Sequence, residues 1–375
     1  MKNSKQTWSE SIRPVTGYPK MNGVVEALER LARELGPETR LPRTRELSKA
    51  LGVTVVTLNL GLAQLERRGL LDRRPRSGIF VSPNITQKTV GLVLGWNIFS
   101  ERVEDATFYS LLLACCAKRA ELNKERFSIF LDTAAPNSAS TEASPQHHQD
   151  LVDALSGGRL DGLLLISSQG PEQDQWLRSY GVPVVNLNTT DQPGCVGVDY
   201  EALIRMAAGE LMSMGVRSIG LITAFPPEVA CFRRAAIEMG FHFEEEWIAL
   251  QVTAGSNESL DEQGRMGARE IMGRSFASRD KGFPNGLIIG NDLMARGACS
   301  YFTEKGIGIG ENLQVVSHAN KGSHILQAWE ERISRCEADP NELAEAMFSQ
   351  LETLMAGKSL DAGIKVSPHL RRRRE

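Results

Sequence analysis

Apolar residues recur at helical spacing three times near the start of the chain. Residues 22–36, 43–52 and 52–71 each place leucines or valines three or four positions apart, which predicts three helices with one buried face each. Two short strands, LLDRR at 70–74 and IFVSP at 79–83, flank a turn of Pro, Arg, Ser and Gly, which predicts a β-hairpin. Three helices followed by a hairpin are typical of a winged helix-turn-helix, which we place at residues 1–83.

The third predicted helix carries too many apolar residues for a helix with one buried face. Leu58, Leu62 and Leu65 form that face, whereas Val56 and Leu60 fall where water should be. In a winged helix-turn-helix, this helix lies in the DNA major groove with its N-terminal residues against base edges. Valines there can contact thymine methyl groups, so we interpret the far side as a DNA-reading surface. The alternative is that Val56 and Leu60 pack against the wing or a partner subunit.

The charge distribution supports the first interpretation. Residues 1–83 carry 15 Lys and Arg against 8 Asp and Glu, whereas the rest of the chain carries 28 against 38. A basic head on an acidic body indicates that the head meets a polyanion, with arginines on phosphates and uncharged side chains on bases. The predicted DNA-binding residues are Arg43, Thr44, Arg45, Thr54, Val55, Val56, Thr57, Asn59, Arg73, Arg74, Arg76 and Gly78.

The stretch LPRTRELSKALGVTVVTLNLGLAQLERRGLLDRRPRSGIFVSP resembles the GntR-family DNA-binding domain, and the likeness extends over residues 20–83. The resemblance implies that positions matching Arg45, Thr54 and Gly78 approach DNA, together with recognition-helix positions matching Val55, Thr57 and Asn59. Positions 55 and 59 are often arginines in that family. Their replacement by Val and Asn leaves DNA binding expected, but the operator sequence cannot be taken from the family.

Beyond a short polar linker at 84–88, compact apolar runs alternate with helical patterns from residue 89 onward. Continuous Val, Ile and Leu strands joined by helical crossovers predict a parallel sheet covered on both faces. The number of such units predicts two lobes, with a ligand cleft outside the carboxyl ends of the strands. The apolar runs are 89–95, 127–132, 160–167, 182–188, 218–223, 247–252, 285–290 and 313–317.

The order and spacing of RLDGLLLIS, VPVVNLN, VGVDYEALIRMAAGELMSMGVRSIGLIT, CFRRAAIEMGF and GNDLMARGA resemble the LacI/GalR-type effector domain, a periplasmic-binding-protein-like fold, over residues 89–370. A GntR head on such a body resembles the arabinose-repressor arrangement. The resemblance implies a transcription regulator, usually a repressor, that dimerises on palindromic operators and responds to a small effector in the cleft between the lobes.

The same resemblance places effector-binding residues at Phe108 and Tyr109 on one side of the cleft and at Asn291, Asp292 and Asn320 on the other. Aromatic faces stack on sugar C–H surfaces, and amides or carboxylates hold hydroxyl groups. Two positions depart from the family. Its clamping arginine corresponds to Glu228, and an aspartate corresponds to Ala319. Glu228 either accepts hydroxyl groups, meets a cationic ligand, or belongs to a cleft that no longer binds a ligand.

Other function classes find little support in the sequence. The six cysteines show no CxxC pair, so we expect no metal, no cofactor and a reducing cytoplasm. The polar N-terminus lacks the apolar core of a secretory signal. A pyridoxal-phosphate enzyme fused to a GntR head is the enzymatic alternative, but no lysine stands in a recognisable Schiff-base context. The C-terminal LRRRRE is either a final strand with solvated arginines or a second nucleic-acid contact.

Overall fold

The computed structural model describes residues 21–94, 107–131, 148–166, 171–251, 258–277 and 282–373. The chain separates into two compact units. One comprises Met1–Val93, Ala120–Leu163 and Gln169–Val184, and the other comprises Leu94–Arg119, Leu164–Ser168 and Val185–Glu375.

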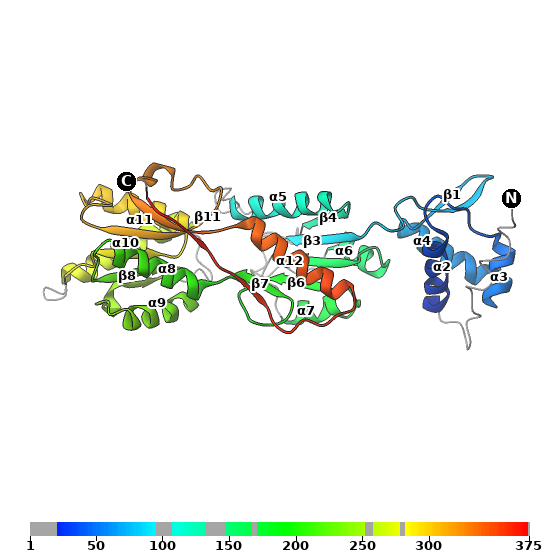
Figure 1. Cartoon of the computed structure of the whole chain (residues 1–375), viewed down its shortest axis with the longest axis horizontal. Helices are drawn as coiled ribbons and strands as arrows, with labels where there is room; N and C mark the ends of the chain where they lie inside the picture. The colour runs from blue at the N-terminus through cyan, green and yellow to red at the C-terminus, as the bar shows by residue number, and fades with distance from the viewer. Residues whose placement is uncertain are drawn as a thin grey trace. The chain divides into compact units, whose positions relative to one another are not determined.

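The head has the predicted three helices and hairpin (Figure 1). They are α2 (Met21–Leu35), α3 (Thr44–Leu51), α4 (Val55–Arg67), β1 (Leu71–Arg74) and β2 (Gly78–Val81). β1 and β2 pair antiparallel, with Leu71 opposite Val81. The leucines and valines of the three helices form one core beneath the hairpin. Ile85, in the predicted linker, is buried in that core.

Capping residues set the turn between the second and third helices. Gly52 ends α3 in the left-handed conformation, with φ of 67°, and Thr54 Oγ1 accepts a hydrogen bond from Thr57 N at 3.2 Å to start α4. The N-cap of α3 is Arg43. Glu46 closes the first turn there by accepting a hydrogen bond from Arg43 N at 3.2 Å.

Two six-stranded sheets make up the body. The strand order is β13-β7-β6-β5-β3-β4 in one sheet and β14-β12-β11-β10-β8-β9 in the other. Elements before α8 are β3 (Thr89–Leu94), α5 (Thr107–Leu122), β4 (Arg126–Leu131), α6 (Gln149–Ser156), β5 (Gly162–Leu165), α7 (Pro171–Arg178), β6 (Val184–Leu187) and β7 (Cys195–Val198). The later elements are α8 (Tyr200–Ser213), β8 (Ile219–Thr223), α9 (Pro226–Glu238), β9 (Ile248–Leu250), α10 (Leu260–Ala277), β10 (Gly286–Ile289), α11 (Asp292–Glu304), β11 (Gln314–Asn320), β12 (Ile333–Ala338), α12 (Pro340–Met355), β13 (Ile364–Val366) and β14 (His369–Arg371).

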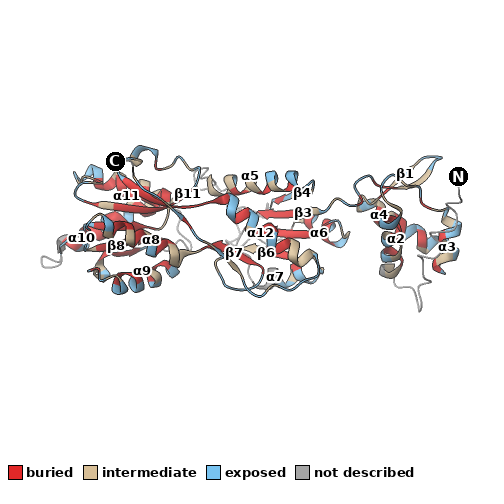
Figure 2. Ribbon diagram, viewed as in Figure 1, coloured by how far each residue is buried: buried red, intermediate tan, exposed pale blue. Residues whose placement is uncertain are grey.

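The sheet that contains β8, β10 and β11 is parallel up to β12 and buried along its length (Figure 2). Helices α8 and α9 pack on one face, and α10 and α11 pack on the other. The second helix pair crosses at very short range, because a Cβ atom at Gly297 would overlap the Asp261 carbonyl oxygen and one at Gly264 would overlap Met294. Because β8, β10 and β11 run parallel, they end at the same edge of their sheet. Helices α9 and α11 begin at that edge.

The C-terminal segment joins both sheets with only two residues between its strands. β13 pairs parallel with β7, with Ile364 opposite Val196, and β14 pairs antiparallel with β12, with Leu370 opposite Cys336 (red in Figure 1). The arginines at the end of this segment bond to other residues of the chain. Arg371 pairs with Glu330, Arg372 Nε donates to Glu210 at 3.1 Å, and Arg373 donates to Gln314 at 2.7 Å. The geometry favours the final-strand interpretation of this segment over a nucleic-acid tail.

Candidate functional site

One face of α4 is exposed and free of charge. Val55, Val56 and Leu60 are 43%, 71% and 55% exposed, and Asn59 is exposed beside them. Leu58, by contrast, is fully buried. The two valines occupy the first turn of the helix, so they stand at the end that a winged helix-turn-helix directs at bases. Packing of Val56 and Leu60 against the wing is ruled out, whereas their packing against a partner subunit stays open.

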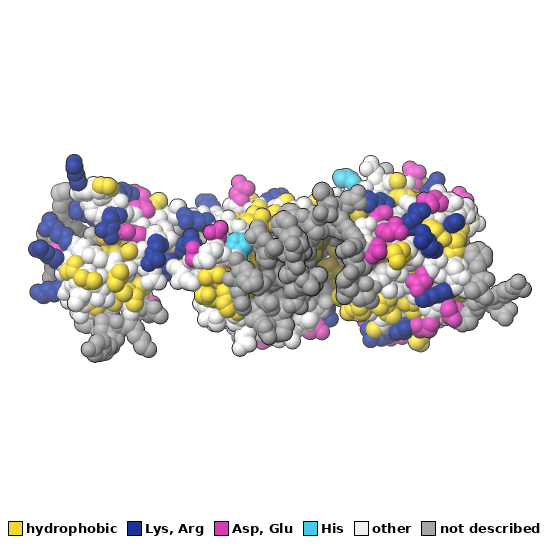
Figure 3. Space-filling view, turned by 180° about the vertical axis from the view of Figure 1, so that it is seen from behind, with side chains coloured by type: hydrophobic (Ala, Val, Ile, Leu, Met, Phe, Trp, Pro, Cys, Tyr) yellow, Lys and Arg dark blue, Asp and Glu magenta, His cyan; other side chains and the backbone are white. Residues whose placement is uncertain are grey.

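Arginines surround this face, and they fall into two groups. Arg43, Arg45 and Arg76 are exposed and form no ion pair within the part of the chain that the structure describes. The strand arginines are paired: Arg73 Nε lies 2.8 Å from Glu66, and Arg74 lies 3.1 Å from Glu38. Figure 3 shows Lys and Arg side chains gathered on the head, with apolar side chains between them. The guanidinium groups of the three exposed arginines thus differ from those of the strand arginines in having no carboxylate partner among the described residues.

The tip of the hairpin depends on backbone conformations that restrict side chains. Arg76 has a φ of 62°, and Gly78 has a φ of 114°. A Cβ atom at Gly78 would lie 2.8 Å from Nε of Arg40, which is bridged to Phe80 across the hairpin. The positive φ of Gly78 therefore favours glycine at this position, since the Arg40 side chain could move aside.

A cavity of about 310 Å³ lies at the strand edge where α9 and α11 begin, within the unit formed by residues 94–119, 164–168 and 185–375. Both sheets contribute to its wall, through residues at the ends of β6, β7 and β11 and the first turns of α5 and α11. Its lining residues are Thr107, Phe108, Tyr109, Leu187, Asn188, Thr189, Gly197, Val198, Tyr200, Leu260, Asn291, Asp292, Leu293, His318, Asn320, Ile325 and Leu343. The volume is that of a small-molecule site.

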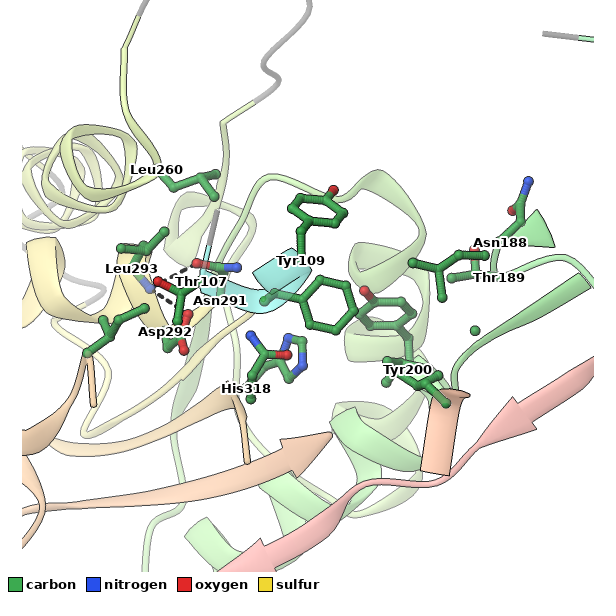
Figure 4. Close-up of a pocket in the computed structure, with 17 residues that line it drawn as sticks. Thr107, Tyr109, Asn188, Thr189, Tyr200, Leu260, Asn291, Asp292, Leu293 and His318 are labelled. Atoms are coloured by element: carbon green, nitrogen blue, oxygen red, sulfur yellow. Dashed lines mark hydrogen bonds between the residues drawn. The ribbon is translucent and has the colours of Figure 1, made fainter. Parts of the chain in front are cut away.

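The cavity brings together all but one of the predicted effector residues (Figure 4). Phe108, Tyr109, Asn291, Asp292 and Asn320 line it. Sequence reasoning missed the cavity residues Tyr200, His318, Asn188 and Thr189. A signal for them exists, because Asn188, Thr189 and Tyr200 follow apolar runs and His318 interrupts one.

Glu228 is the predicted residue that does not line the cavity. It lies in the first turn of α9, fully buried, and accepts a hydrogen bond from Thr223 Oγ1 at the end of β8. The side chain faces Gly290, where a Cβ atom would overlap its carboxylate. Burial raises the pKa of Glu228 to about 7. Burial also raises the pKa of Tyr200, and the negative charge of Glu228 raises it further. Glu228 thus lies behind the cavity wall.

We expect Glu228 to make the stability of the protein depend on pH. Because its pKa rises from 4.5 to about 7 on folding, the folded state holds a proton that the unfolded state releases. The corresponding stability is fully present below pH 4.5 and is lost as the pH rises through about 7, a change of about 3 kcal/mol. Glu228→Gln should therefore raise the urea midpoint at pH 8 and leave it nearly unchanged at pH 4.5. Equal shifts at both pH values would contradict this account.

The polar floor of the cavity is formed by buried side chains. Asp292 is 2% exposed and His318 is 7% exposed. Asp292 Oδ1 accepts a hydrogen bond from Leu293 N at 3.0 Å, and His318 Nδ1 lies 3.1 Å from the Gly290 carbonyl oxygen. Burial lowers the pKa of His318, although Asp292 opposes this effect, so the ring is held in its neutral form near pH 7.

Apolar and aromatic side chains make up the rest of the wall. Phe108 and Tyr109 meet edge to face at a centroid distance of 5.3 Å, and Tyr200 contacts Phe225 at 4.8 Å. Asn188 and Asn320 add amide groups to the lining. Within the described ranges, no Lys or Arg is among the residues that line the cavity.

The described residues bear on two other kinds of site. They hold no cluster of three or more His, Cys, Asp or Glu side chains that could bind a metal ion. No helix within the described ranges has the length and hydropathy needed to cross a membrane.

Comparisons with known proteins agree with this architecture. Residues 21–81 match the family model of bacterial regulatory proteins of the gntR family, and residues 208–374 match that of the periplasmic binding protein-like domain. The HTH-type transcriptional repressor PurR of Mannheimia succiniciproducens is 23% identical over 250 residues, which are 63% of this chain and 65% of that protein. The chain thus spans slightly less than two thirds of the curated relatives it matches.

Solved structures of regulators share the fold. The transcriptional regulator CelR in complex with cellobiose has a TM-score of 0.59 at 19% identity, covering 95% of this chain and 99% of that one. The lac repressor dimer bound to operator and an anti-inducer has a TM-score of 0.58 at 17% identity, covering 76% and 93%.

These matches confirm the predicted fold class, a winged helix-turn-helix followed by a two-sheet periplasmic-binding-protein-like domain. The head is of the gntR type, and the body has the fold of LacI-family regulators.

Proposed function

We propose that this protein is a transcription regulator that binds operator DNA through its head and responds to a small molecule in the cavity of its body. The observation that carries the proposal is the exposed, uncharged N-terminal face of α4 beside unpaired arginines. In water such a face gains nothing from two exposed valines, whereas in a major groove they can bury against thymine methyl groups. The gntR-family match and the PurR-type relatives support this function.

The roles of the individual residues follow from their exposure. Arg43, Arg45 and Arg76 would hold phosphates and fix the position of the head, and Asn59 would read bases together with the valines. Thr44, Thr54, Thr57 and Gly78 shape this surface. Arg73 and Arg74 must exchange Glu66 and Glu38 for phosphate before they can contribute.

We further propose a homodimer, because operators read by such heads are commonly palindromic and a two-fold protein matches them. Repression is the proposed outcome, since the curated relatives are named as repressors. The effector would shift DNA affinity by binding one arrangement of the dimer better than another.

We place the protein in the cytoplasm, where its DNA partner lies. We divide the chain into a head at 1–83, a linker at 84–88 and an effector domain at 89–375.

A purely catalytic body finds no support in the cavity. Pyridoxal phosphate needs a lysine for its Schiff base and a cation for its phosphate, and the described residues that line the cavity include neither Lys nor Arg. We therefore propose that the protein acts as a regulator and not as an enzyme. Two buried acceptor atoms of the cavity, Asp292 Oδ2 and His318 Nε2, have no hydrogen-bond partner among the described residues. These atoms favour a cleft that binds a ligand over one that has lost its ligand.

Selection of bound duplexes from a random pool tests the DNA-binding proposal. The full-length protein should enrich a two-fold symmetric motif with two half-sites, and fluorescence anisotropy should then give a specific affinity at least about a thousandfold above that for random duplex. Failure to enrich any motif would refute the proposed function.

Arg45→Ala should weaken operator binding and reduce its salt dependence. Loss of one phosphate contact is expected to lower the slope of log K against log salt by about 0.9. Binding isotherms at several salt concentrations measure this slope. Arg30→Ala is the matched control, because Arg30 is exposed on α2, away from the recognition helix in the sequence, and should leave the slope unchanged. Equal slopes for the Arg45→Ala variant and the wild type would exclude a phosphate contact.

A further inference from the structure

The C-terminal end of helix α4 bonds to the effector domain. Arg68, the C-cap of α4, donates from Nε to the carbonyl oxygen of Gly158 at 2.6 Å. Gly158 follows α6 and belongs to the same compact unit as the head. The helix that carries exposed valines in its first turn is thus held by the effector domain at its other end.

The Arg68 guanidinium joins two acceptors, one on each side of this contact. Its Nη1 lies 2.6 Å from Glu29 Oε2 on α2, so one side chain binds a carboxylate of the head and a carbonyl group of the effector domain. The side chains of Arg68 and Glu29 are only 18% and 19% exposed. Charge-assisted hydrogen bonds of this kind fix a guanidinium group in one orientation. Glu29 therefore directs Arg68 toward Gly158.

A second arginine approaches the head from the effector domain. Arg126 begins β4, and a Cβ atom at Gly69 would lie 3.2 Å from its Nη1 atom. Gly69 follows the C-cap of α4 and has a φ of 71°. The cavity that remains among Arg33, Arg68, Arg126 and their neighbours measures only about 20 Å³, which is space for about one water molecule. The end of α4 therefore packs closely against the effector domain.

The linker between the head and the effector domain has little slack. Ile85 is 1% exposed in the core of the head, and its carbonyl oxygen accepts a hydrogen bond from Arg33 Nη1 at 3.1 Å. The carbonyl oxygen of Lys88 accepts from Arg126 N at 2.7 Å. The three Cα steps from Ile85 to Lys88 span at most about 11 Å. A tether of this length keeps the head beside the effector domain.

We propose that these contacts fix the orientation of α4 on the effector domain and that Arg68 is the positioning residue. The inference rests on the proposed function, because its consequence concerns a dimer on two half-sites. Two heads held in fixed orientations present their α4 helices at one separation, so the dimer should accept one half-site spacing and reject others. Heads on free tethers would accept several spacings.

Hydrogen exchange of the full-length protein without DNA tests the contact itself. Arg68→Ala should speed exchange at least about tenfold in peptides that cover residues 84–90 and 156–161, because both sides of the contact are released. Arg67→Ala is the matched control, since the Arg67 side chain donates to the Ala63 carbonyl oxygen of its own helix. It should leave exchange in both peptides unchanged. Equal exchange in the wild type and Arg68→Ala would overturn the proposal.

The effector-domain side of the contact has its own matched pair of variants. Gly158 and Gly181 have φ of 60° and 71°, so alanine strains the backbone at both positions. A Cβ atom at Gly158 would lie 3.3 Å from Arg68 Nε, whereas no described neighbour lies within 4 Å of that position at Gly181. Gly158→Ala should therefore speed exchange at residues 84–90, and Gly181→Ala should not. Equal effects of the two variants would contradict a role for the contact.

Operator spacing tests the consequence for DNA binding. The probes are the selected operator, the same operator with one base pair added between its half-sites, and a duplex with a single half-site. One added base pair turns one half-site by about 35° and moves it by about 3.4 Å. The wild type should bind the altered spacing at least about thirtyfold more weakly than the operator, whereas the difference for Arg68→Ala should fall to within about fivefold.

Binding to the single half-site shows whether the head itself is intact. Arg68→Ala should bind this duplex with the wild-type affinity, because α4 keeps its exposed face. An unchanged spacing penalty in Arg68→Ala, or an equal loss of affinity for all three duplexes, would overturn the proposal.

The outcomes separate this inference from the proposed function. If the wild type selects no operator, the proposed function is refuted, and hydrogen exchange without DNA still decides whether Arg68 holds the head. If the wild type binds its operator specifically but tolerates the altered spacing, the fixed orientation is refuted and the regulator stands.

Discussion

Val56→Glu is expected to abolish specific operator binding, with affinity at least about a hundredfold below wild type. The side chain is 71% exposed on the first turn of α4, so the substitution should leave the head folded. A carboxylate at this position would enter the major groove between phosphates, where like charge costs several kcal/mol. Fluorescence anisotropy with the selected operator measures the loss, and circular dichroism verifies the fold.

Ile237→Glu is the matched control for this prediction. Ile237 is 69% exposed on α9, so the same change of an exposed aliphatic residue to glutamate is made in the body. DNA affinity should stay within about twofold of wild type, provided that gel filtration shows an unchanged oligomeric state. Retained operator binding in Val56→Glu would show that α4 does not enter the groove and would favour packing of its exposed face against a partner subunit.

Gly297→Ala is expected to be strongly destabilising. Gly297 lies inside α11 where this helix crosses α10, and a Cβ atom would overlap the backbone carbonyl oxygen of Asp261. Backbone cannot move aside as a side chain can, so the two helices must separate. A cost of about 3 kcal/mol is expected, which corresponds to a drop in melting temperature of roughly 6 to 12 °C for a domain of this size.

Gly273→Ala provides the comparison for this substitution. Gly273 lies near the end of α10 with nothing within 4 Å of its Cβ position. Alanine favours the helix there by up to about 1 kcal/mol, so this variant should melt at or slightly above the wild-type temperature. Differential scanning calorimetry of both variants measures the contrast. Equal melting temperatures would show that the crossing of α10 and α11 tolerates a wider separation.

The head could be predicted from the sequence almost completely, because its signals are local. The spacing of Leu58, Leu62 and Leu65 defines the buried face of one helix, and Thr54 caps the helix a few residues earlier. The pairing of Arg73 with Glu66 and of Arg74 with Glu38 could not be predicted in this way. Those ion pairs depend on how the hairpin folds back on the helices, which single-residue patterns do not record.

The cavity could be predicted only in part. Asn291 and Asp292 follow an apolar strand directly, so their position at the strand edge is evident from the pattern. Glu228 lies in the first turn of a helix, where a small rotation decides between the cavity and the core, and no pattern in the sequence fixes that rotation. His318 was missed because it lies inside a buried strand, where polar residues are usually satisfied within the protein.

The short strand β14 protects the edge of a sheet. β14 covers the backbone groups of β12 that would otherwise form an open sheet margin. Trimming by a carboxypeptidase as far as Leu370 would therefore do more than shorten a tail. It would remove the Arg372 guanidinium that pairs with Glu210 and one of the two guanidinium groups on Glu330, and it would expose an unpaired edge on which another polypeptide could add a strand.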